Sequence, residues 1–458
     1  MAIITDVSAA AEATPIVVIH TSNFDAYLAH TDARTRSWLV ATGFKAGAHT
    51  FALIPSVEGA VEQVLVGVKD AGDVYALSHL PFSLPVGNYS ISSHHDTLDP
   101  YAAALSWGLG SYQFDCYKKV SRAPASLVIA ASEAVARAVR TLVSATLIRN
   151  LVNTPTEDMG PLHLSIVARE MAGEFGAVFR EWVGDELLAN NFPAIHAVGR
   201  ASHRPPRLIE LTWGDASHPR VALVGKGVCF DTGGLDIKGA DGMRWMKKDM
   251  GGGAHALGLA RLIMAEALPV YLHMLVPAVE NAISGNAYRP GDVIATRKGL
   301  SVEIGNTDAE GRIVLSDALA LAAESKPVII IDFATLTGAA RVALGPELPA
   351  TFSNDELWIA DLISASEKTR DPLWRMPLWQ PYNAMIEPAI ADLVNTGGPQ
   401  AGAVTAALFL EHFIPKDQPW IHIDLFAWNP KSRPGRPEGG EAQTLRATLE
   451  MLRARLQK

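Results

Sequence analysis

The sequence has few cysteines, no long apolar run and no excess of positive charge. Only Cys116 and Cys229 occur in 458 residues, so neither a disulfide framework nor a cysteine-based zinc site is available. No stretch reaches the roughly 18 consecutive apolar residues that a membrane span needs, and the N-terminus lacks the basic start and apolar run of a secretory signal. We therefore expect a soluble, cytoplasmic protein that does not engage a membrane.

Positive charge is scattered along the chain. The formal net charge is −9, and no basic stripe suited to a phosphate backbone is visible, so nucleic acid is not expected as a partner. A content of 48% hydrophobic and 19% charged residues is typical of a folded globular protein. At this length, two or three domains are expected.

The pattern of apolar residues changes along the chain and predicts a domain division. Short β-branched runs at 15–19 and 61–68 predict a small, divergent α/β domain over residues 1–130. From about 133 to 151 apolar residues recur at helical spacing, which predicts a long helix within a linker over 131–155. A larger domain over 156–458 is expected to follow.

The larger domain alternates strand-like and helix-like runs. This alternation predicts an α/β fold with a mixed, mostly parallel sheet flanked by helices, in which ligands lie beyond the carboxyl ends of the strands. The strand-like runs are Arg207–Trp213, Val221–Gly225, Tyr271–Pro277 and Val328–Asp332, and the helix-like runs are Gly252–Ala267, Val314–Glu324 and Ala403–Phe413.

Charge and glycine gather where the second of these strands ends. The apolar run 221–225 is followed by Lys226, and a glycine-rich turn then delivers Asp231 and Lys238. A glycine-rich turn after a strand is usually only a turn, and a lysine at a strand end usually points to solvent. By itself the segment is therefore weak support for a site.

A second charged segment is Asn306-Thr307-Asp308-Ala309-Glu310-Gly311-Arg312. Asp308 and Glu310 are two residues apart, so in an extended stretch they point the same way. Gly311 permits a tight turn, and Arg312 in the first turn of the following helix offers a fork suited to a planar carboxylate or carbonate. The simpler interpretation is an acidic helix cap with an arginine salt bridge.

Asp249 completes a set of four acids, although alone it is an ordinary helix-capping residue. Asp231, Asp249, Asp308 and Glu310 in one place would repel one another unless divalent cations held them. Carboxylates that bridge two cations about 3.5–4 Å apart form the usual two-metal hydrolase arrangement. Lys226 fits beside metals only if it is deprotonated and coordinates through nitrogen.

Several other conspicuous residues are expected to be structural. His94, His95 and Asp96 lie in a polar stretch and are interpreted as surface or turn residues. His255 and His422 are predicted to be buried and hydrogen-bonded rather than ligands, and Cys229 is predicted to be a packed core thiol. The segment 225–227 lacks the spacing of a phosphate-cradling loop.

Taken together, these segments resemble a known family. Residues 306–312 look like the signature of the leucyl aminopeptidase (cytosol aminopeptidase) family of dinuclear metallo-aminopeptidases, and residues 224–238 resemble its metal loop. Similarity extends through 149–155, 288–292 and 334–339. It covers roughly residues 108 to 428, whereas the first hundred residues match weakly.

The resemblance implies two divalent metal ions per subunit: zinc, manganese or magnesium. One would be bound by Asp231, Asp308 (side chain and backbone carbonyl) and Glu310. The other would be bound by Lys226, Asp231, Asp249 and Glu310.

The resemblance also implies a reaction and an assembly. Residues 156–458 would be the catalytic domain of an aminopeptidase that releases N-terminal amino acids from short peptides by attack of a metal-bridging water. Lys238 would act as electrophile, and Arg312 would hold a bicarbonate ion as general base. The substrate would contact Lys238, Asp249, Thr335 and Leu336, and the subunits would form a homohexamer.

Three departures and two alternatives remain. The chain has Leu425-Phe426-Ala427-Trp428 where the family usually has a small-residue turn, Gly251–His255 is unusually glycine-rich, and the N-terminal half is divergent. The protein is expected to be an active aminopeptidase; the alternative is a binding or architectural protein that kept the fold with weak or absent peptidase activity. A rival activity, metal-dependent phosphoryl hydrolysis, gives Lys226 no obvious place.

Overall fold

The structure is a computed structural model that describes residues 2–92 and 96–457. Contacts divide the chain into two compact units. The first comprises Met1–Val143 with Lys431–Glu438, and the second comprises Ser144–Pro430 with Gly439–Lys458. The segment 431–438 thus belongs by its contacts to the first unit, although it lies close to the end of the sequence.

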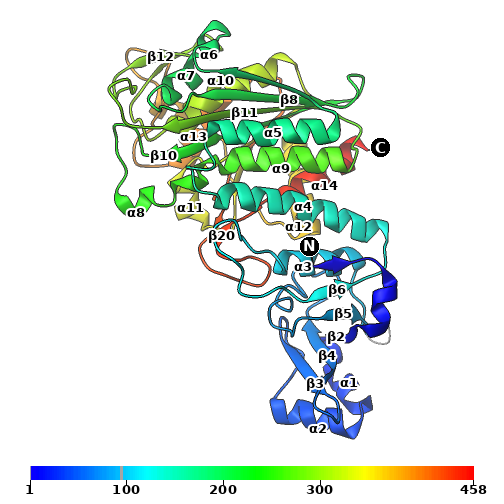
Figure 1. The fold of residues 1–458 in the computed structure, drawn as a ribbon. Helices are drawn as coiled ribbons and strands as arrows, with labels where there is room; N and C mark the ends of the chain where they lie inside the picture. Colours follow the sequence, from blue (N-terminus) through cyan, green and yellow to red (C-terminus); the bar gives the residue numbers. More distant parts are fainter. Residues whose placement is uncertain (1, 93–95, 458) are drawn as a thin grey trace. The chain divides into compact units, whose positions relative to one another are not determined.

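The first unit is built on a six-stranded sheet in the order β1-β6-β5-β2-β4-β3 (Figure 1). Its strand pairs are parallel except for β3 with β4. Both faces of β2 are covered, because Ile16 and Val18 belong to one apolar cluster whereas Val17 and Ile19 belong to another. The elements are β1 Ile3–Ile4, β2 Thr14–His20, α1 Phe24–His30, α2 Ala33–Thr42, β3 Phe51–Pro55, β4 Val61–Val68, β5 Asn88–Ile91, α3 Pro100–Gly110 and β6 Ser126–Val128.

The second unit is built on a nine-stranded mixed sheet in the order β16-β15-β18-β14-β9-β11-β8-β7, with β10 paired to β11. The central strands β18, β14, β9, β11 and β10 pair in parallel, whereas β8 and β7 pair antiparallel to their neighbours. Strand β15 pairs antiparallel to β18 and parallel to β16. The strands are β7 Val178–Val183, β8 Arg207–Trp213, β9 Arg220–Gly225, β10 Gly227–Asp231, β11 Tyr271–Asn281, β14 Ile329–Ala334, β15 Ala350–Ser353, β16 Trp374–Arg375 and β18 Trp420–Asp424.

Helices cover both faces of this sheet, as Figure 1 shows for α9 on one side and α10 on the other. The helices are α4 Glu133–Asn153, α5 Pro161–Phe175, α6 Glu186–Ala189, α7 Pro193–Gly199, α8 Ala240–Met243, α9 Gly251–Ala265, α10 Glu310–Glu324, α11 Gly338–Leu344, α12 Glu356–Thr369, α13 Gly402–Glu411 and α14 Leu445–Leu456. Short strands outside the main sheet are β12 Val293–Ala295, β13 Ser301–Glu303, β17 Leu393–Val394, β19 Trp428–Asn429 and β20 Gly439–Gly440.

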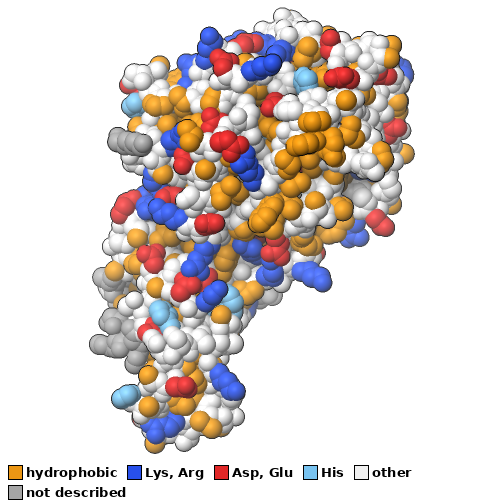
Figure 2. Space-filling model, turned by 180° about the vertical axis from the view of Figure 1, so that it is seen from behind, with side chains coloured by type: hydrophobic (Ala, Val, Ile, Leu, Met, Phe, Trp, Pro, Cys, Tyr) orange, Lys and Arg blue, Asp and Glu red, His pale blue; other side chains and the backbone are white. Residues whose placement is uncertain are grey.

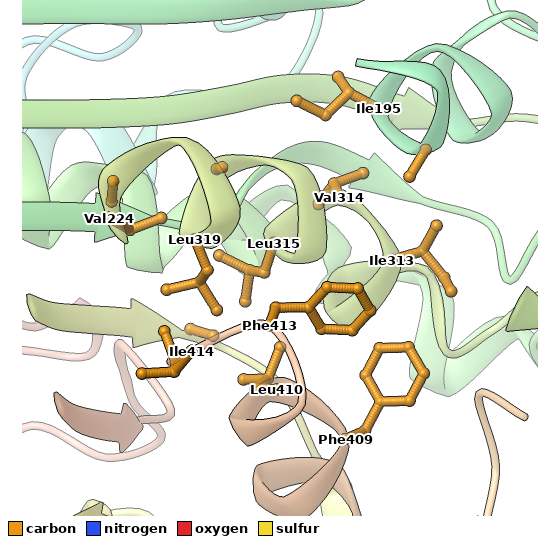
Figure 3. Close-up of a cluster of buried hydrophobic side chains, with 14 of the residues drawn as sticks. Ile195, Val224, Ile313, Val314, Leu315, Leu319, Phe409, Leu410, Phe413 and Ile414 are labelled. Atoms are coloured by element: carbon orange, nitrogen blue, oxygen red, sulfur yellow. The ribbon is translucent and has the colours of Figure 1, made fainter. Parts of the chain in front are cut away.

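The main core of the second unit lies around α10 (Figure 3). Ile313, Leu315 and Leu319 of this helix are fully buried with Val224 of β9 and with Phe409 of α13. At roughly 1.5–3 kcal/mol for each fully buried large apolar side chain, this packing fixes the position of the helix that begins at Glu310. The N-terminus of α10 is therefore held firmly relative to the ends of the central strands.

The predicted fold class is confirmed: an α/β protein with a smaller N-terminal unit and a larger unit with a mixed, mostly parallel sheet. The strand predicted at 207–213 is β8, and the long helix predicted from about 133 is α4. Residues 133–143 of α4 fall in the first unit and 144–153 in the second. The domain limits 1–130, 131–155 and 156–458 stay a prediction.

Charges of both signs are mixed on the face of the molecule that Figure 2 shows. None of the helices in the described part of the chain is long and apolar enough to span a membrane.

The start of α9 approaches the sheet so closely that only glycine fits. A Cβ atom on Gly252 would lie 2.1 Å from the backbone oxygen of Phe333 in β14. By contrast, a Cβ on Gly173 in α5 would meet no atom within 4 Å. The two positions are both helical, so they separate the effect of close packing from that of helix propensity.

Gly252→Ala is expected to destabilise the protein by about 1–3 kcal/mol, because the new methyl group pushes α9 away from β14. Gly173→Ala is expected to stabilise it by roughly 0.5–1 kcal/mol, because alanine is the better helix former. Denaturant titrations of both variants and the parent protein measure the difference. A Gly252→Ala variant as stable as Gly173→Ala would contradict the close approach.

Candidate metal centre

Charged and polar residues converge where the parallel strands of the second unit end. Lys226 follows β9, Asp231 ends β10, Asn281 ends β11, and Thr335 follows β14. Because these strands run in parallel, their carboxyl ends meet at one edge of the sheet. The site lies at the edge that the alternation of strands and helices predicts.

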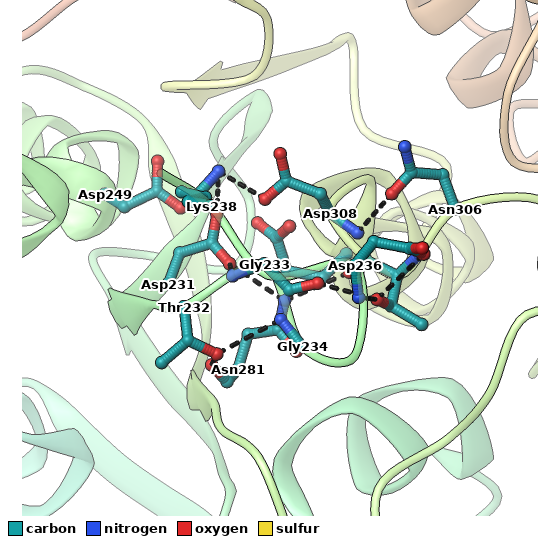
Figure 4. Close-up of polar contacts among 12 residues, drawn as sticks. Asp231, Thr232, Gly233, Gly234, Asp236, Lys238, Asp249, Asn281, Asn306 and Asp308 are labelled. Atoms are coloured by element: carbon teal, nitrogen blue, oxygen red, sulfur yellow. Dashed lines mark hydrogen bonds and ion pairs between the residues drawn. The ribbon is translucent and has the colours of Figure 1, made fainter. Parts of the chain in front are cut away.

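Asp231 is fixed in position by two hydrogen bonds (Figure 4). Its Oδ1 accepts from the backbone nitrogen of Gly233 and from Nδ2 of Asn281, each at 2.8 Å. Its Oδ2 lies 2.8 Å from Nζ of Lys238, which also forms an ion pair with Asp308. Lys238 therefore bridges two of the four predicted acids.

Asp308 and Glu310 reach the same place, but not in the way that the sequence suggests. The prediction of an extended stretch with a turn at Gly311 is wrong, because Asp308 lies in a turn and Glu310 is the first residue of α10. Carboxylate oxygens of Asp231, Asp308 and Glu310 all lie within 4.8 Å of one another. Convergence comes from the turn and the helix start, not from strand alternation.

The loop before Asp308 is held from both sides. Asn395 Oδ1 accepts from the backbone nitrogens of Gly305 and Asn306 at 2.8 and 3.1 Å, and its Nδ2 donates to the Asn306 oxygen at 2.7 Å. The carbonyl of Thr307 accepts from the hydroxyl of Tyr288 at 2.6 Å. These bonds fix the backbone that presents Asp308.

Lys226 occupies the centre of the other half of the site and is 3% exposed. Its Nζ donates to Asp249 Oδ2 at 2.6 Å and to the backbone oxygen of Thr335 at 3.0 Å, and it lies 2.8 Å from Glu310 Oε1. A Cβ on Gly311 would come within 2.6 Å of Lys226 Cε. Any larger residue at position 311 would therefore clash with the side chain of Lys226.

The charges of the site do not balance among themselves. Burial, followed by the neighbouring charge of Asp231, raises the pKa of Glu310 to about 8 and that of Asp308 to about 6. Glu310 Oε2 is buried and has no hydrogen-bond partner in the described part of the chain. Buried carboxylate oxygens with free lone pairs and perturbed pKa values are the donor chemistry that a divalent cation satisfies.

Arg312, in the first turn of α10, is a buried cation. It is 8% exposed, and its Nε has no hydrogen-bond partner among the described residues. Burial lowers the pKa of Arg312 to about 10, so the guanidinium still carries its charge at neutral pH. A small planar oxyanion would complete its hydrogen bonds.

The four acids, Lys226 and Lys238 line a cavity of about 440 Å³. Thr335 fixes one wall, because its hydroxyl donates to Asp249 Oδ1 at 2.9 Å. Asp424 fixes another, because its carboxylate accepts from the backbone nitrogens of Leu336 and Thr337 and from the Thr337 hydroxyl. The structure thus places every predicted site residue except Arg312 along this one cavity.

The residues predicted to be structural are buried and bonded. His255 Nδ1 lies 2.6 Å from the Gly251 oxygen and its Nε2 accepts from Gln443, while His422 Nδ1 lies 2.7 Å from Asp332 Oδ1. Cys229 is fully buried. Asp96 accepts hydrogen bonds from His20 and Asn23, and the prediction for His94 and His95 lies outside the described residues.

Sequence reasoning missed three residues that shape the site: Asn281, Asn395 and Asp424. Asn281 and Asp424 each end a parallel strand, so a polar residue closing an apolar run was a usable signal. Asn395 comes just after the two-residue strand β17, and nothing in its local sequence points to the loop that it holds.

Comparison with known proteins shows that both parts of the chain match models of one family. A model described as the catalytic domain of the cytosol aminopeptidase family matches residues 146–449, and one described as the N-terminal domain of M17 aminopeptidases matches residues 14–130. The matches extend beyond the region 108–428 in which the sequence alone shows resemblance. In particular, the first domain, which was expected to be divergent, matches the N-terminal domain model of the family.

Individual solved structures and relatives are similar to the chain over most of its length. The crystal structure of a cytosol aminopeptidase from Coxiella burnetii is 50% identical, covers 97% of each chain and superposes with a TM-score of 0.93. The bottromycin maturation enzyme BotP, solved in complex with Mn, is 31% identical with a TM-score of 0.87 over 96% of this chain and 99% of its own. A probable cytosol aminopeptidase from Syntrophotalea carbinolica is 45% identical over 67% of this chain and 62% of its own length, and one from Roseiflexus castenholzii is 40% identical over 78% and 77%.

The fold and the acidic centre define a metal-dependent hydrolase on a mixed α/β sheet. The chain belongs to the cytosol aminopeptidase family, and thereby to the metallopeptidases.

Divalent cations are expected to stabilise the protein, because they relieve the repulsion among its buried carboxylates. A cation at about 100 times its dissociation constant adds roughly 2.7 kcal/mol to the free energy of unfolding. Thermal unfolding in chelator and in excess Mn²⁺ measures the effect. Glu310→Gln should lose most of this response while Glu367→Gln, on the exposed face of α12, keeps it; equal responses would argue against the site.

Proposed function

We propose that the protein removes single amino acids from the free amino terminus of short peptides in a metal-dependent reaction. The observation that carries this proposal is the convergence of Asp231, Asp308 and Glu310 within 4.8 Å, beside Lys226 and Lys238, in a family of aminopeptidases. The Mn in the BotP structure supports a divalent cation here. Zinc, manganese and magnesium are the candidate ions.

The donor set suggests two cation sites of unequal character. Asp231, Asp308 and Glu310 would hold one cation through oxygen alone. Lys226, Asp231, Asp249 and Glu310 would hold the other, with nitrogen among the ligands. Such a pair lowers the pKa of a water and polarises a carbonyl.

Lys226 must lose its proton to serve as a ligand. Burial alone lowers its pKa, but the carboxylates of Asp249, Glu310 and Asp231 raise it overall above its usual value. Bound cations would neutralise those carboxylates and add positive charge beside Lys226, which lowers its pKa and favours the neutral amine.

Five residues would take part in binding the peptide and cleaving it. Lys238, which follows the glycine-rich turn after Asp231, would donate a hydrogen bond to the substrate's carbonyl oxygen and stabilise the charge that develops on it. Asp249, Thr335 and Leu336 line the part of the cavity that would receive the first residue. Arg312 would hold a bicarbonate ion, which supplies a general base when bound.

We further propose a homohexamer in the cytoplasm. Large apolar side chains exposed in the second unit, such as Trp374 and Trp379 at 58% and 56%, support burial in an assembly. Sedimentation at working concentration tests this, and a fully active monomer would refute it.

The activity is tested with alanyl- and leucyl-anilides in the presence of Zn²⁺, Mn²⁺ or Mg²⁺. Turnover is expected, and Asp231→Ala or Glu310→Ala should lose both turnover and bound metal, since each removes a shared ligand. Metal content is measured alongside activity. No turnover with any of the ions would favour the alternative of a fold-retaining binding protein.

Arg312→Ala is expected to separate catalysis from metal binding. Metal content should stay at the parent level, while turnover falls by about 10²–10⁴-fold through loss of the base. Added bicarbonate at high concentration should restore part of the rate. Loss of metal in this variant would mean that Arg312 supports the ligands instead.

A further inference from the structure

Two cations that make no short carboxylate contact in the described part of the chain line the cavity beside the metal centre. Lys248 precedes Asp249, and Arg341 lies on α11; both line the cavity together with Phe426. Lys248 Nζ lies 5.1 Å from the centroid of the Phe426 ring, and Arg341 Cζ lies 4.8 Å from it. The aromatic ring thus contacts both positive charges.

Neither cation is neutralised in the way that the lysines of the metal centre are. Lys226 and Lys238 each contact two carboxylates. Lys248, although only 5% exposed, lies 3.8 Å from Asp249 Oδ1, beyond hydrogen-bond distance. Arg341 is exposed, and its guanidinium forms no hydrogen bond or ion pair among the described residues.

The other acids nearby are already engaged. Asp424 is held by the backbone nitrogens of Leu336 and Thr337 and by the Thr337 hydroxyl. Asp249 accepts from Lys226 and Thr335. A buried ammonium and an exposed guanidinium on one cavity wall therefore favour a carboxylate that arrives with the ligand.

The orientation of the substrate decides which carboxylate this is. In the proposed function, the carbonyl oxygen faces Lys238, and the part of the cavity that Asp249 lines receives the first residue. Lys248 Nζ lies 3.8 Å from Asp249 Oδ1, so Lys248 also lies in that part of the cavity. The substrate group nearest to Lys248 is then the side chain of the first residue.

We propose that Lys248 and Arg341 select peptides whose first residue is aspartate or glutamate. This inference rests on the proposed aminopeptidase function and adds a substrate class to it. Phe426 packs against both cations and against the hydrocarbon part of the bound side chain. Neutral side chains of similar size fill the same space but bring no carboxylate to the two cations.

Glutamyl- and glutaminyl-anilides test the proposal, because their side chains match in shape and differ in charge. The parent enzyme should favour glutamyl by at least about tenfold in kcat/KM, the value of one charge-assisted hydrogen bond. Lys248→Met and Arg341→Met should each bring the ratio toward one. Lys416→Met, at an exposed position outside the cavity lining, removes the same charge and should leave the ratio as in the parent.

Arg341→Glu gives a second test at an exposed position, where folding is not at risk. It should reverse the preference, so that arginyl-anilide gains on glutamyl-anilide. A parent enzyme that cleaves leucyl-anilide but treats glutamyl and glutaminyl alike would overturn the inference and leave the proposed function standing. An equal loss on all substrates in Lys248→Met would also overturn it, because Lys248 would then only balance Asp249.

Two further measurements separate the remaining outcomes. If alanyl-alanine is cleaved much faster than its C-terminal amide, and Arg341→Met removes that difference alone, the cations hold the peptide's terminal carboxylate and the inference is wrong. If no anilide is cleaved, the proposed function fails. In that case, calorimetry still tests whether Lys248 and Arg341 bind an acidic side chain, by comparing the affinities for free glutamate and free glutamine. Equal affinities would refute the inference.

Discussion

Repulsion among four carboxylates, three of them buried, is the constraint around which the second unit is organised. Asp231 and Asp249 are almost fully buried, Glu310 is 1% exposed, and no ordinary protein core tolerates such a group of acids without compensation. The compensation comes from Lys226 and Lys238, from directed N–H donors such as Asn281, and, as we propose, from cations. The surrounding packing keeps the acids from moving apart.

That packing depends on rigid elements rather than on the loops that carry the acids. The α10 core fixes Glu310 and Arg312, and the glycine-tight contact of α9 with β14 fixes the segment that follows Asp249. Asn395 and Tyr288 then hold the backbone around Asp308. Because each acid comes from a different element, a shift of one helix changes the distances among all of them.

Much of this could be predicted from the sequence, and the reason is local. Strands such as β4 and β8 match their predicted limits because β-branched residues bounded by turns specify them within a few residues. The candidate site residues could be proposed because most of them cluster in two short segments, around Lys226 and Asp308, with Asp249 as the exception. The geometry of Asp308 and Glu310 could not, because the helix starts earlier than the apolar pattern suggests. The contacts among Lys248, Arg341 and Phe426 join three distant segments and exist only in the folded chain.

The segment 431–438 has a consequence for biosynthesis. Arg436 donates to the hydroxyl of Tyr75 at 2.6 Å, with its guanidinium 4.4 Å from the centre of that ring, and Gly435 packs against Tyr75 and Ser78. A ribosome therefore releases almost the whole of the second unit before it supplies the piece that completes the first. During translation, Tyr75 and Ser78 therefore lack these contacts until most of the second unit has been synthesised.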